Sequence, residues 1–212
     1  MPERRDVTLA RVAAGGTALV AVLLVLVQPS GLAPPSGWWT PIMALELARG
    51  PDDLGFLAGP EAAVHRDALR LVHVIDMVFA VAYGALLFAA GRLAGARSTA
   101  SAAGLAILAD WLENAVIFAI LERLDGGEPV TSLLPVLAVA TWIKWNAIAV
   151  GLASTGLALW GRRRGLSVWL VAAACSAPIA LVWRAPIAGE LMGAAIVAGF
   201  IGLAVLVVRP PA

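Results

Sequence analysis

Long apolar runs alternate with polar connections along this chain of 212 residues. A run of about 20 apolar residues can cross a bilayer as a helix. We predict six such spans, at residues 12–27, 71–93, 102–121, 133–159, 166–182 and 191–208. The runs are continuous and lack the period of two that barrel strands show. The sequence therefore predicts an all-α integral membrane bundle of six transmembrane helices in one domain, residues 1–212, with a kink at Pro178 in the fifth span.

The connection between the first two spans is the only long one. Its segment from Pro41 to Ala48 predicts a short interfacial or re-entrant helix, and Trp38 and Trp39 before it suit a membrane interface. Gly50-Pro-Asp-Asp predicts a further helical turn, with Pro51 at the first helical position. We expect these pieces to form a helical lid over the extracytoplasmic mouth of the bundle. The alternative is a disordered loop.

Composition agrees with a membrane protein. The chain is 61% hydrophobic and 14% charged, whereas a soluble domain is about 25% charged. The first run has no small-x-small cleavage site directly after it, so we expect a retained anchor. By the positive-inside rule, both termini are expected in the cytoplasm. The arginines that favour this orientation are Arg4, Arg5, Arg11, Arg92, Arg97, Arg162, Arg163, Arg164 and Arg209.

Several classes of function have no support in the sequence. We find no phosphate-binding glycine loop, no zinc-spaced Cys/His set and no basic nucleic-acid patch, so no cofactor, metal or nucleic-acid partner is expected. The lone Cys175 cannot form an internal disulfide. Gly189 and Gly193 form a GxxxG pattern, which allows close helix approach. Packing within the monomer is the favoured use of that pattern, and a homodimer is the alternative.

Charged residues occur in the middle of three apolar runs. Asp76 lies in the second, Asp110 and Glu113 in the third, and Lys144, the only lysine, in the fourth. A charge at that depth costs several kcal/mol unless it is paired, protonated or hydrated. At about 1.5 Å per residue, Asp110, Glu113 and Lys144 fall near the midplane and Asp76 somewhat higher. We therefore expect these four residues to converge on one buried site in the outer half of the bilayer, as candidate catalytic residues.

The charges at this site do not balance. Three carboxylates face one ammonium, which leaves two excess negative charges if all are ionised. At least one carboxyl must carry a proton, or a cation or water must complete the site. A neutral carboxyl in a membrane pocket is a candidate proton donor.

Other side chains are candidates to line the pocket and bind a ligand. Positions 110, 113 and 114 share a helix face, as do 73, 76 and 83. Three tryptophans lie at midplane and can wall an apolar or cationic ligand, although bulky packing is the alternative. The candidate ligand-binding residues are Glu46, Tyr83, Trp111, Asn114, Trp142 and Trp145.

Each buried charge also has a structural interpretation. Asp110 and Lys144 can form an ion pair that fixes helix register. Asp76 can bond to the lid or to an arginine of the outer connection. His73 is expected to be solvated, and Glu190 can pair with Arg184.

Three functions remain open at this stage. The first is a membrane enzyme or binder that acts by acid–base chemistry on an isoprenoid, sterol-like or acyl molecule. Its broad layout is similar to that of small polytopic isomerases and cyclases of the emopamil-binding-protein type, by architecture alone. The second is a structural or assembly protein with a polar, register-fixing cluster. The third is a proton- or cation-coupled carrier.

Several short motifs resemble a recurring group of small bacterial inner-membrane proteins with no assigned activity. The matching segments are Leu45-Glu-Leu-Ala-Arg with the following Pro-Asp-Asp, Asp76 with Ala82-Tyr83, Ala109-Asp-Trp-Leu-Glu-Asn, and Lys144-Trp145. The resemblance covers residues 40–160. It implies a bacterial inner-membrane address, with membrane lipids as neighbours, and nothing about chemistry.

Overall fold

The computed structural model describes residues 4–29, 31–183 and 185–209, and every regular element among them is a helix. Six helices are long and apolar enough to cross a membrane. They are α1 (Arg4–Leu26), α3 (Ala63–Ala94), α4 (Thr99–Asp125), α5 (Leu134–Ala158), α6 (Arg164–Trp183) and α7 (Pro186–Val208). The predicted all-α bundle of six spans is confirmed, and the chain has the architecture of a multi-pass membrane protein.

Short helical pieces fill the long connection between the first two spans. They are α2 (Pro41–Glu46) and two 3₁₀ helices, η1 (Pro51–Leu57) and η2 (Pro60–Ala62). Thr40 caps α2, because its hydroxyl accepts from the Met43 amide while Pro41 occupies the first helical position. We call residues 38–62 the lid. The predicted short helical segment between the first two spans is therefore present.

The long helices extend beyond the apolar runs that predicted them. α1 begins at Arg4 and not at residue 12, and α3 begins at Ala63 and not at residue 71. α4 likewise continues to Asp125. The additional turns carry charged residues, which a search for apolar runs does not detect. At the expected kink, α6 continues as helix on both sides of Pro178.

The charged turns of α3 and α4 also hold the end of the lid. Arg66 is buried, and its Nε lies 2.5 Å from Asp125 Oδ1. The same guanidinium donates to the backbone carbonyls of Leu57 at 2.8 Å and Gly59 at 2.9 Å. Arg66 and Asp125, which lie in predicted polar connections, thus link the lid to α3 and α4.

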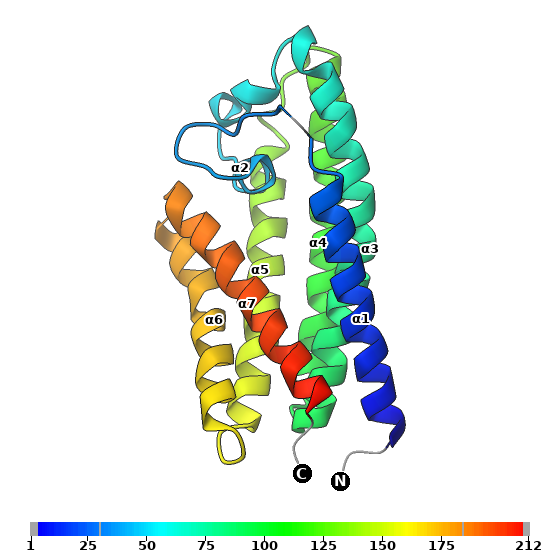
Figure 1. Cartoon of the computed structure of the whole chain (residues 1–212). Helices are drawn as coiled ribbons and strands as arrows, with labels where there is room; N and C mark the ends of the chain where they lie inside the picture. The colour runs from blue at the N-terminus through cyan, green and yellow to red at the C-terminus, as the bar shows by residue number, and fades with distance from the viewer. Residues whose placement is uncertain (1–3, 30, 184, 210–212) are drawn as a thin grey trace.

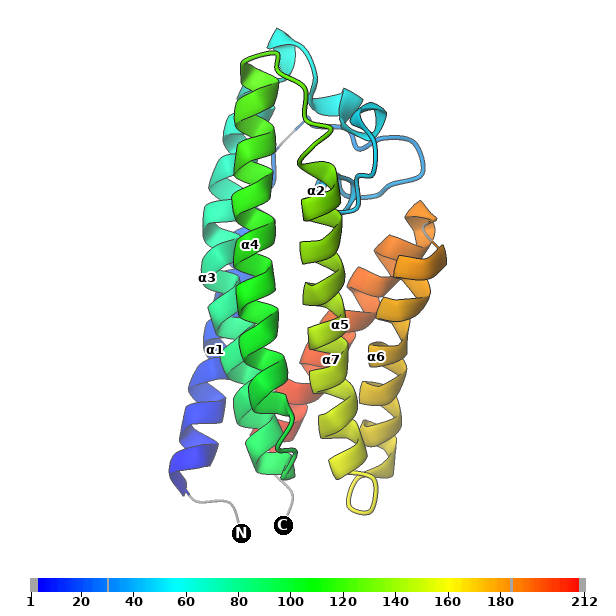
Figure 2. The ribbon, with the colours of Figure 1, turned by 180° about the vertical axis from the view of Figure 1, so that it is seen from behind.

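The bundle has two distinct ends (Figure 1). The beginning of α1 and the end of α7 lie at one end and the lid lies towards the other, where α3 and α4 extend beyond α5, α6 and α7. The view from behind shows α4 and α5 side by side on the opposite face (Figure 2). α7 crosses the bundle obliquely and contacts α6, α3 and α1.

Buried apolar residues form two clusters. The larger one joins α3, α5, α6 and α7 through residues such as Leu87, Leu152, Leu170 and Leu203. The smaller one lies beneath the lid, whose leucines pack against α3, α4 and α5; its members include Leu45, Leu54, Leu57, Leu69, Ile117 and Leu137. The lid is therefore part of the protein core.

Candidate functional site

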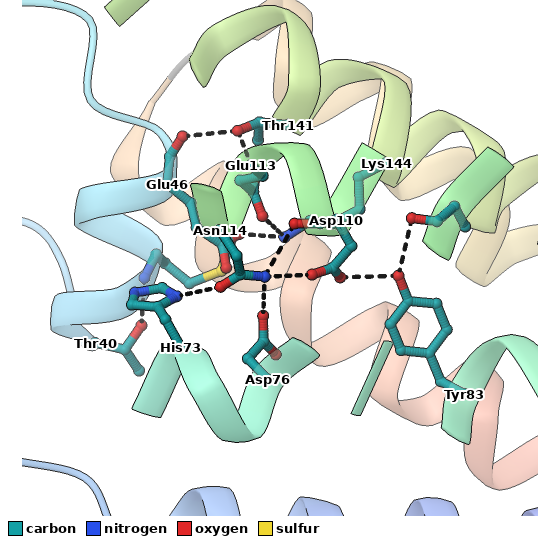
Figure 3. Close-up of polar contacts among 12 residues, drawn as sticks. Thr40, Glu46, His73, Asp76, Tyr83, Asp110, Glu113, Asn114, Thr141 and Lys144 are labelled. Carbon is teal, nitrogen blue, oxygen red and sulfur yellow. Dashed lines mark hydrogen bonds and ion pairs between the residues drawn. The ribbon is translucent and has the colours of Figure 1, made fainter. Parts of the chain in front are cut away.

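A polar layer separates the two apolar clusters. On α4, Asp110, Glu113 and Asn114 lie between Ala106 of the larger cluster and Ile117 of the smaller one. On α5, Thr141 and Lys144 lie between Leu137 and Ala147, and on α3, His73 and Asp76 lie between Leu69 and Ala80. Figure 3 shows these side chains converging with Glu46 of the lid. Three long helices and α2 therefore contribute to one buried polar site.

Lys144 is the centre of one half of this layer. Its side chain is 4% exposed, and its Nζ lies 2.9 Å from Glu46 Oε2 and also pairs with Glu113 Oε2. The Thr141 hydroxyl lies 2.5 Å from Glu113 Oε1 and 3.1 Å from the backbone oxygen of Glu46. We call Glu46, Glu113, Thr141 and Lys144 the lysine cluster. Because Glu46 belongs to the lid, this cluster fixes α2 against α4 and α5.

Asn114 is the centre of the other half. Its amide nitrogen lies 3.0 Å from Asp76 Oδ2, 2.7 Å from Asp110 Oδ1 and 3.0 Å from the Asp110 backbone oxygen. Its amide oxygen lies 2.7 Å from His73 Nδ1. An amide oxygen only accepts, so in this arrangement His73 Nδ1 carries the proton and donates. Asn114 thus connects α3 to α4 and holds two carboxyl groups near each other.

Tyr83 completes this chain of hydrogen bonds. Its hydroxyl lies 2.8 Å from Asp110 Oδ2 and 3.3 Å from the Ala106 backbone oxygen. We call His73, Asp76, Tyr83, Asp110 and Asn114 the aspartate cluster. The two clusters lie side by side, and together they set four carboxyl groups against one ammonium group.

Replacing Tyr83 by phenylalanine tests the hydrogen bond that ends the aspartate cluster. We expect the free energy of unfolding to fall by about 1 kcal/mol, because Asp110 loses a donor while the ring packing is kept. Denaturation of the purified protein in detergent measures this change. An unchanged stability would contradict the hydrogen bond between Tyr83 and Asp110.

A cavity of about 350 Å³ lies beside the polar layer. Its polar lining residues are Glu46, Asp76, Tyr83, Asp110 and Lys144, with Thr40 of the lid and Glu190 on α7. Its remaining walls are largely apolar and aromatic, and they include Trp39, Phe79, Trp145, Ile196, Val197 and Phe200.

The cavity lies between α3 and α7 under the lid. Tyr83 on α3 contacts Phe200 on α7, with 5.5 Å between ring centroids. At the rim, Val197 is 58% exposed and Trp39 is 60% exposed. The exposed surface around the long helices is apolar, so the rim joins the polar wall to the side of the bundle that faces hydrocarbon.

The lid is docked on α7 through a carboxylate and a stripe of small residues. Glu190 Oε1 accepts from the backbone amides of Trp39 and Thr40, both at 2.9 Å. A Cβ on Gly189 would lie 2.6 Å from Leu47 Cδ1, and Gly193 faces the Met43 sulfur. The favoured use of the GxxxG pattern, packing within one chain, is confirmed. The alternative pairing of Glu190 with Arg184 involves a residue outside the described part of the chain.

The structure brings most of the candidate residues into this region. Asp76, Asp110, Glu113 and Lys144 all lie in the polar layer, with Glu46, Tyr83 and Asn114 among them. Trp145 lines the cavity, and Lys144 Nζ lies 4.8 Å from its ring centroid. Glu113 pairs with Lys144 but does not itself line the cavity.

Two candidate tryptophans lie elsewhere, which corrects the expectation that they wall the pocket. Trp111 is 41% exposed and its indole nitrogen donates to the Met77 backbone oxygen. Trp142 is 50% exposed and lines a separate surface groove with Arg49 and Leu181. Both side chains point out of the bundle, because their positions on the helical wheel turn them away from the polar layer.

Three expected contacts also differ from the structure. In place of the expected ion pair with Asp110, Lys144 pairs with Glu46 and Glu113, whereas Asp110 accepts hydrogen bonds from Tyr83 and Asn114. Asp76 bonds to Asn114 and to neither the lid nor an outer arginine in the described residues. His73 is 1% exposed and not solvated.

Sequence reasoning missed several groups on the cavity wall. Glu190 was expected only as a partner of Arg184, and the aromatic residues Phe79 and Phe200 were not singled out. Phe79 lies one helical turn before Tyr83 and packs edge-on against it, so the spacing of the two rings was an available signal. Among the residues that the structure describes, no three His, Cys, Asp or Glu side chains form a group able to hold a metal ion.

Comparison with protein-family models, curated proteins and solved structures found no match for this chain.

Proposed function

We propose that this protein binds a lipid-like molecule in the cavity between α3 and α7 and modifies it by acid–base chemistry. The class covers isoprenoid, sterol-like and acyl molecules. One observation carries the proposal: a cavity in the bundle opens at an apolar rim and ends at a wall of carboxyl groups. An amphiphile fits that arrangement, with its tail along the aromatic residues and its polar end at the aspartate cluster.

The size and chemistry of the cavity support this proposal. Small-molecule pockets are about 300–1,000 Å³, mostly apolar, with a few convergent polar groups. The cavity of about 350 Å³ lies at the lower end of that range. It holds part of an acyl or isoprenoid chain, and the rest of the chain extends through the rim into the bilayer.

The aspartate cluster supplies the groups for proton transfer. Asp76 and Asp110 both face the cavity, and Asn114 holds each of them at a fixed position. A carboxyl within hydrogen-bond reach of the ligand can donate or accept a proton. The lysine cluster has a different part in this proposal. Lys144 and Glu113 set the charge of the neighbourhood and hold the lid in place.

The orientation and address of the protein belong to the same proposal. We place it in the inner membrane of a bacterium, with both termini in the cytoplasm and membrane lipids around it. The turn after α3, with Arg97, and the turn after α5, with Arg162 and Arg163, lie at the same end of the bundle as the beginning of α1 (Figure 1), which supports this orientation under the positive-inside rule.

Blocking the cavity tests the binding step. Ala194 is an exposed lining residue on α7, and Ala194→Trp places an indole in the cavity. Native mass spectrometry of the gently purified protein should show a bound amphiphile in the wild type and at least about ten-fold less of it in the variant. Ala172→Trp, the same change at an exposed position on α6 outside the cavity lining, is the matched control and should retain the ligand. Equal occupancy in the two variants would overturn the proposal.

Solvent exchange tests the chemical step. Once the bound amphiphile is identified, it is incubated with the protein in deuterated water. Acid–base chemistry at carbon predicts deuterium in the recovered molecule or its product, and Asp110→Asn should slow that incorporation. If the ligand gains no deuterium, we would conclude that the protein binds it without catalysing proton transfer.

A structural or assembly role is the second candidate function. The observation that favours it is the lysine cluster, whose members are all buried and join segments 98 residues apart in sequence. Buried ion pairs of this kind can specify one arrangement of helices.

A further inference from the structure

We infer that the ligand of this cavity carries a positive charge at its polar end, as an alkylammonium or similar cationic amphiphile does. This inference rests on the proposed function, because it names the chemical class of the molecule that the cavity holds.

Hydrogen bonding along the polar wall is the first argument. Most of the donors at or directly behind this wall already have acceptors: Lys144 pairs with Glu46 and Glu113, Asn114 donates to Asp76 and Asp110, and Tyr83 donates to Asp110. Acceptors remain, since Asp76 Oδ1 has no hydrogen-bond partner among the described residues. Among the described residues, the lining donors left without a hydrogen-bond acceptor are the neutral indole N–H groups of Trp39 and Trp145 and the third N–H of Lys144, whose Nζ lies 4.8 Å from the Trp145 ring centroid. A wall with free carboxylate oxygens favours a ligand that donates hydrogen bonds.

Charge is the second argument. Glu46, Asp76, Asp110 and Glu190 line the cavity with a single ammonium group, that of Lys144. Lys144 is already shared between Glu46 and Glu113. An anionic head group would meet several carboxyls with no unshared cation, whereas a ligand cation supplies the charge that the polar layer lacks.

The shape and lining of the cavity are the third argument, and they are independent of the acidic residues. Tyr83 contacts both Phe79 and Phe200, with 5.5 Å between ring centroids in each of these two pairs, and the three rings line the cavity together with Asp110. Aromatic faces attract cations more strongly than they attract neutral groups. The same rings accommodate an alkyl chain. An amphiphile with a cationic head therefore fits both the carboxyl groups of the polar wall and the aromatic rings of the lining.

Three probes with the same twelve-carbon chain test this inference: dodecylamine, dodecanol and dodecanoate. Their binding is measured at neutral pH to the full chain in nanodiscs of phosphatidylcholine, with protein-free nanodiscs subtracted. We expect dodecylamine to bind about ten-fold more tightly than dodecanol, and dodecanoate to bind most weakly. In Asp76→Asn the ratio of dodecylamine to dodecanol affinity should fall to about one, because the variant keeps the shape and loses the charge.

The outcomes separate this inference from the proposed function. Equal affinity for the three probes, abolished by Ala194→Trp, would overturn the cationic class and leave the lipid-binding cavity standing. Binding that Ala194→Trp does not change for any probe would overturn both. A preference for dodecylamine that survives in both Asp76→Asn and Asp110→Asn would also overturn the inference, because the charge would then be recognised elsewhere. Asp76 is only half-buried, so its variant tests the charge even where Asp110→Asn does not fold.

Discussion

Lys144→Met is expected to destabilise the folded protein by about 3–5 kcal/mol, the largest effect of any single substitution considered for this chain. The variant replaces the four-carbon apolar stem of lysine with an unbranched side chain of similar size and removes the ammonium group. Glu46 and Glu113 then remain buried without their shared cation. Equilibrium unfolding of the purified protein in mixed micelles measures the loss.

Two control variants show whether this loss comes from burial of unpaired charge. Arg70→Met removes a cation that pairs with Asp67 and Asp125 near the surface, and it should cost less than about 1 kcal/mol. The triple variant Glu46→Gln, Glu113→Gln, Lys144→Met removes all three charges and should recover most of the lost stability. A Lys144→Met protein as stable as the wild type would exclude the structural role of the lysine cluster.

Hydropathy alone was enough to predict the fold class. Each apolar run became one helix, because a helix satisfies its own backbone hydrogen bonds in hydrocarbon. Hydropathy could not predict the charged extensions of α3 and α4, since Arg66 and Asp125 stabilise them through a tertiary contact. Beginning α3 eight residues too late also made His73 look like a surface residue, whereas it lies three helical turns into the helix.

The partner of Lys144 was harder to predict. Asp110 was favoured because it lies at a similar depth along its span. The structure instead pairs Lys144 with Glu46, which is on the lid, so its depth cannot be estimated by counting residues along a span. Residues three apart on a helix differ by about 60° around its axis. Glu113 therefore faces α5, while Asp110 faces α3, where Tyr83 bonds to it.

The positions of the tryptophans were partly available from the sequence. Residues two apart on a helix point about 200° away from each other, so a wheel drawn from Lys144 places Trp142 on the opposite face. The structure shows Trp142 there, half exposed. Two residues at the same depth in the membrane therefore share a pocket less reliably than two residues on the same helix face.

Gly189→Ala is expected to loosen the lid, at a cost of about 1–3 kcal/mol from overpacking. The added Cβ would lie 2.6 Å from Leu47 Cδ1 and 3.0 Å from Trp38 Cζ3. Leu47 can change its rotamer, whereas the bulky Trp38 ring must shift by a few tenths of an ångström, and we expect this shift to displace the lid backbone next to it. That backbone includes the Trp39 amide that Glu190 holds. Displacing it pulls α2 away from α7 and weakens the docking of Glu46.

Hydrogen exchange measured by mass spectrometry follows this change directly. Amides of residues 39–48 should exchange at least about ten-fold faster in Gly189→Ala than in the wild type, because local opening becomes less costly. Gly193→Ala is the matched control one helical turn away, where the new Cβ would meet the Met43 sulfur at 3.7 Å, an ordinary contact. It should leave exchange in the lid unchanged. Equal exchange in the two variants would mean that Glu190 and the lysine cluster hold the lid without the close approach at Gly189. Faster exchange in Gly189→Ala alone would show that this close approach is needed to keep the lid closed over the cavity.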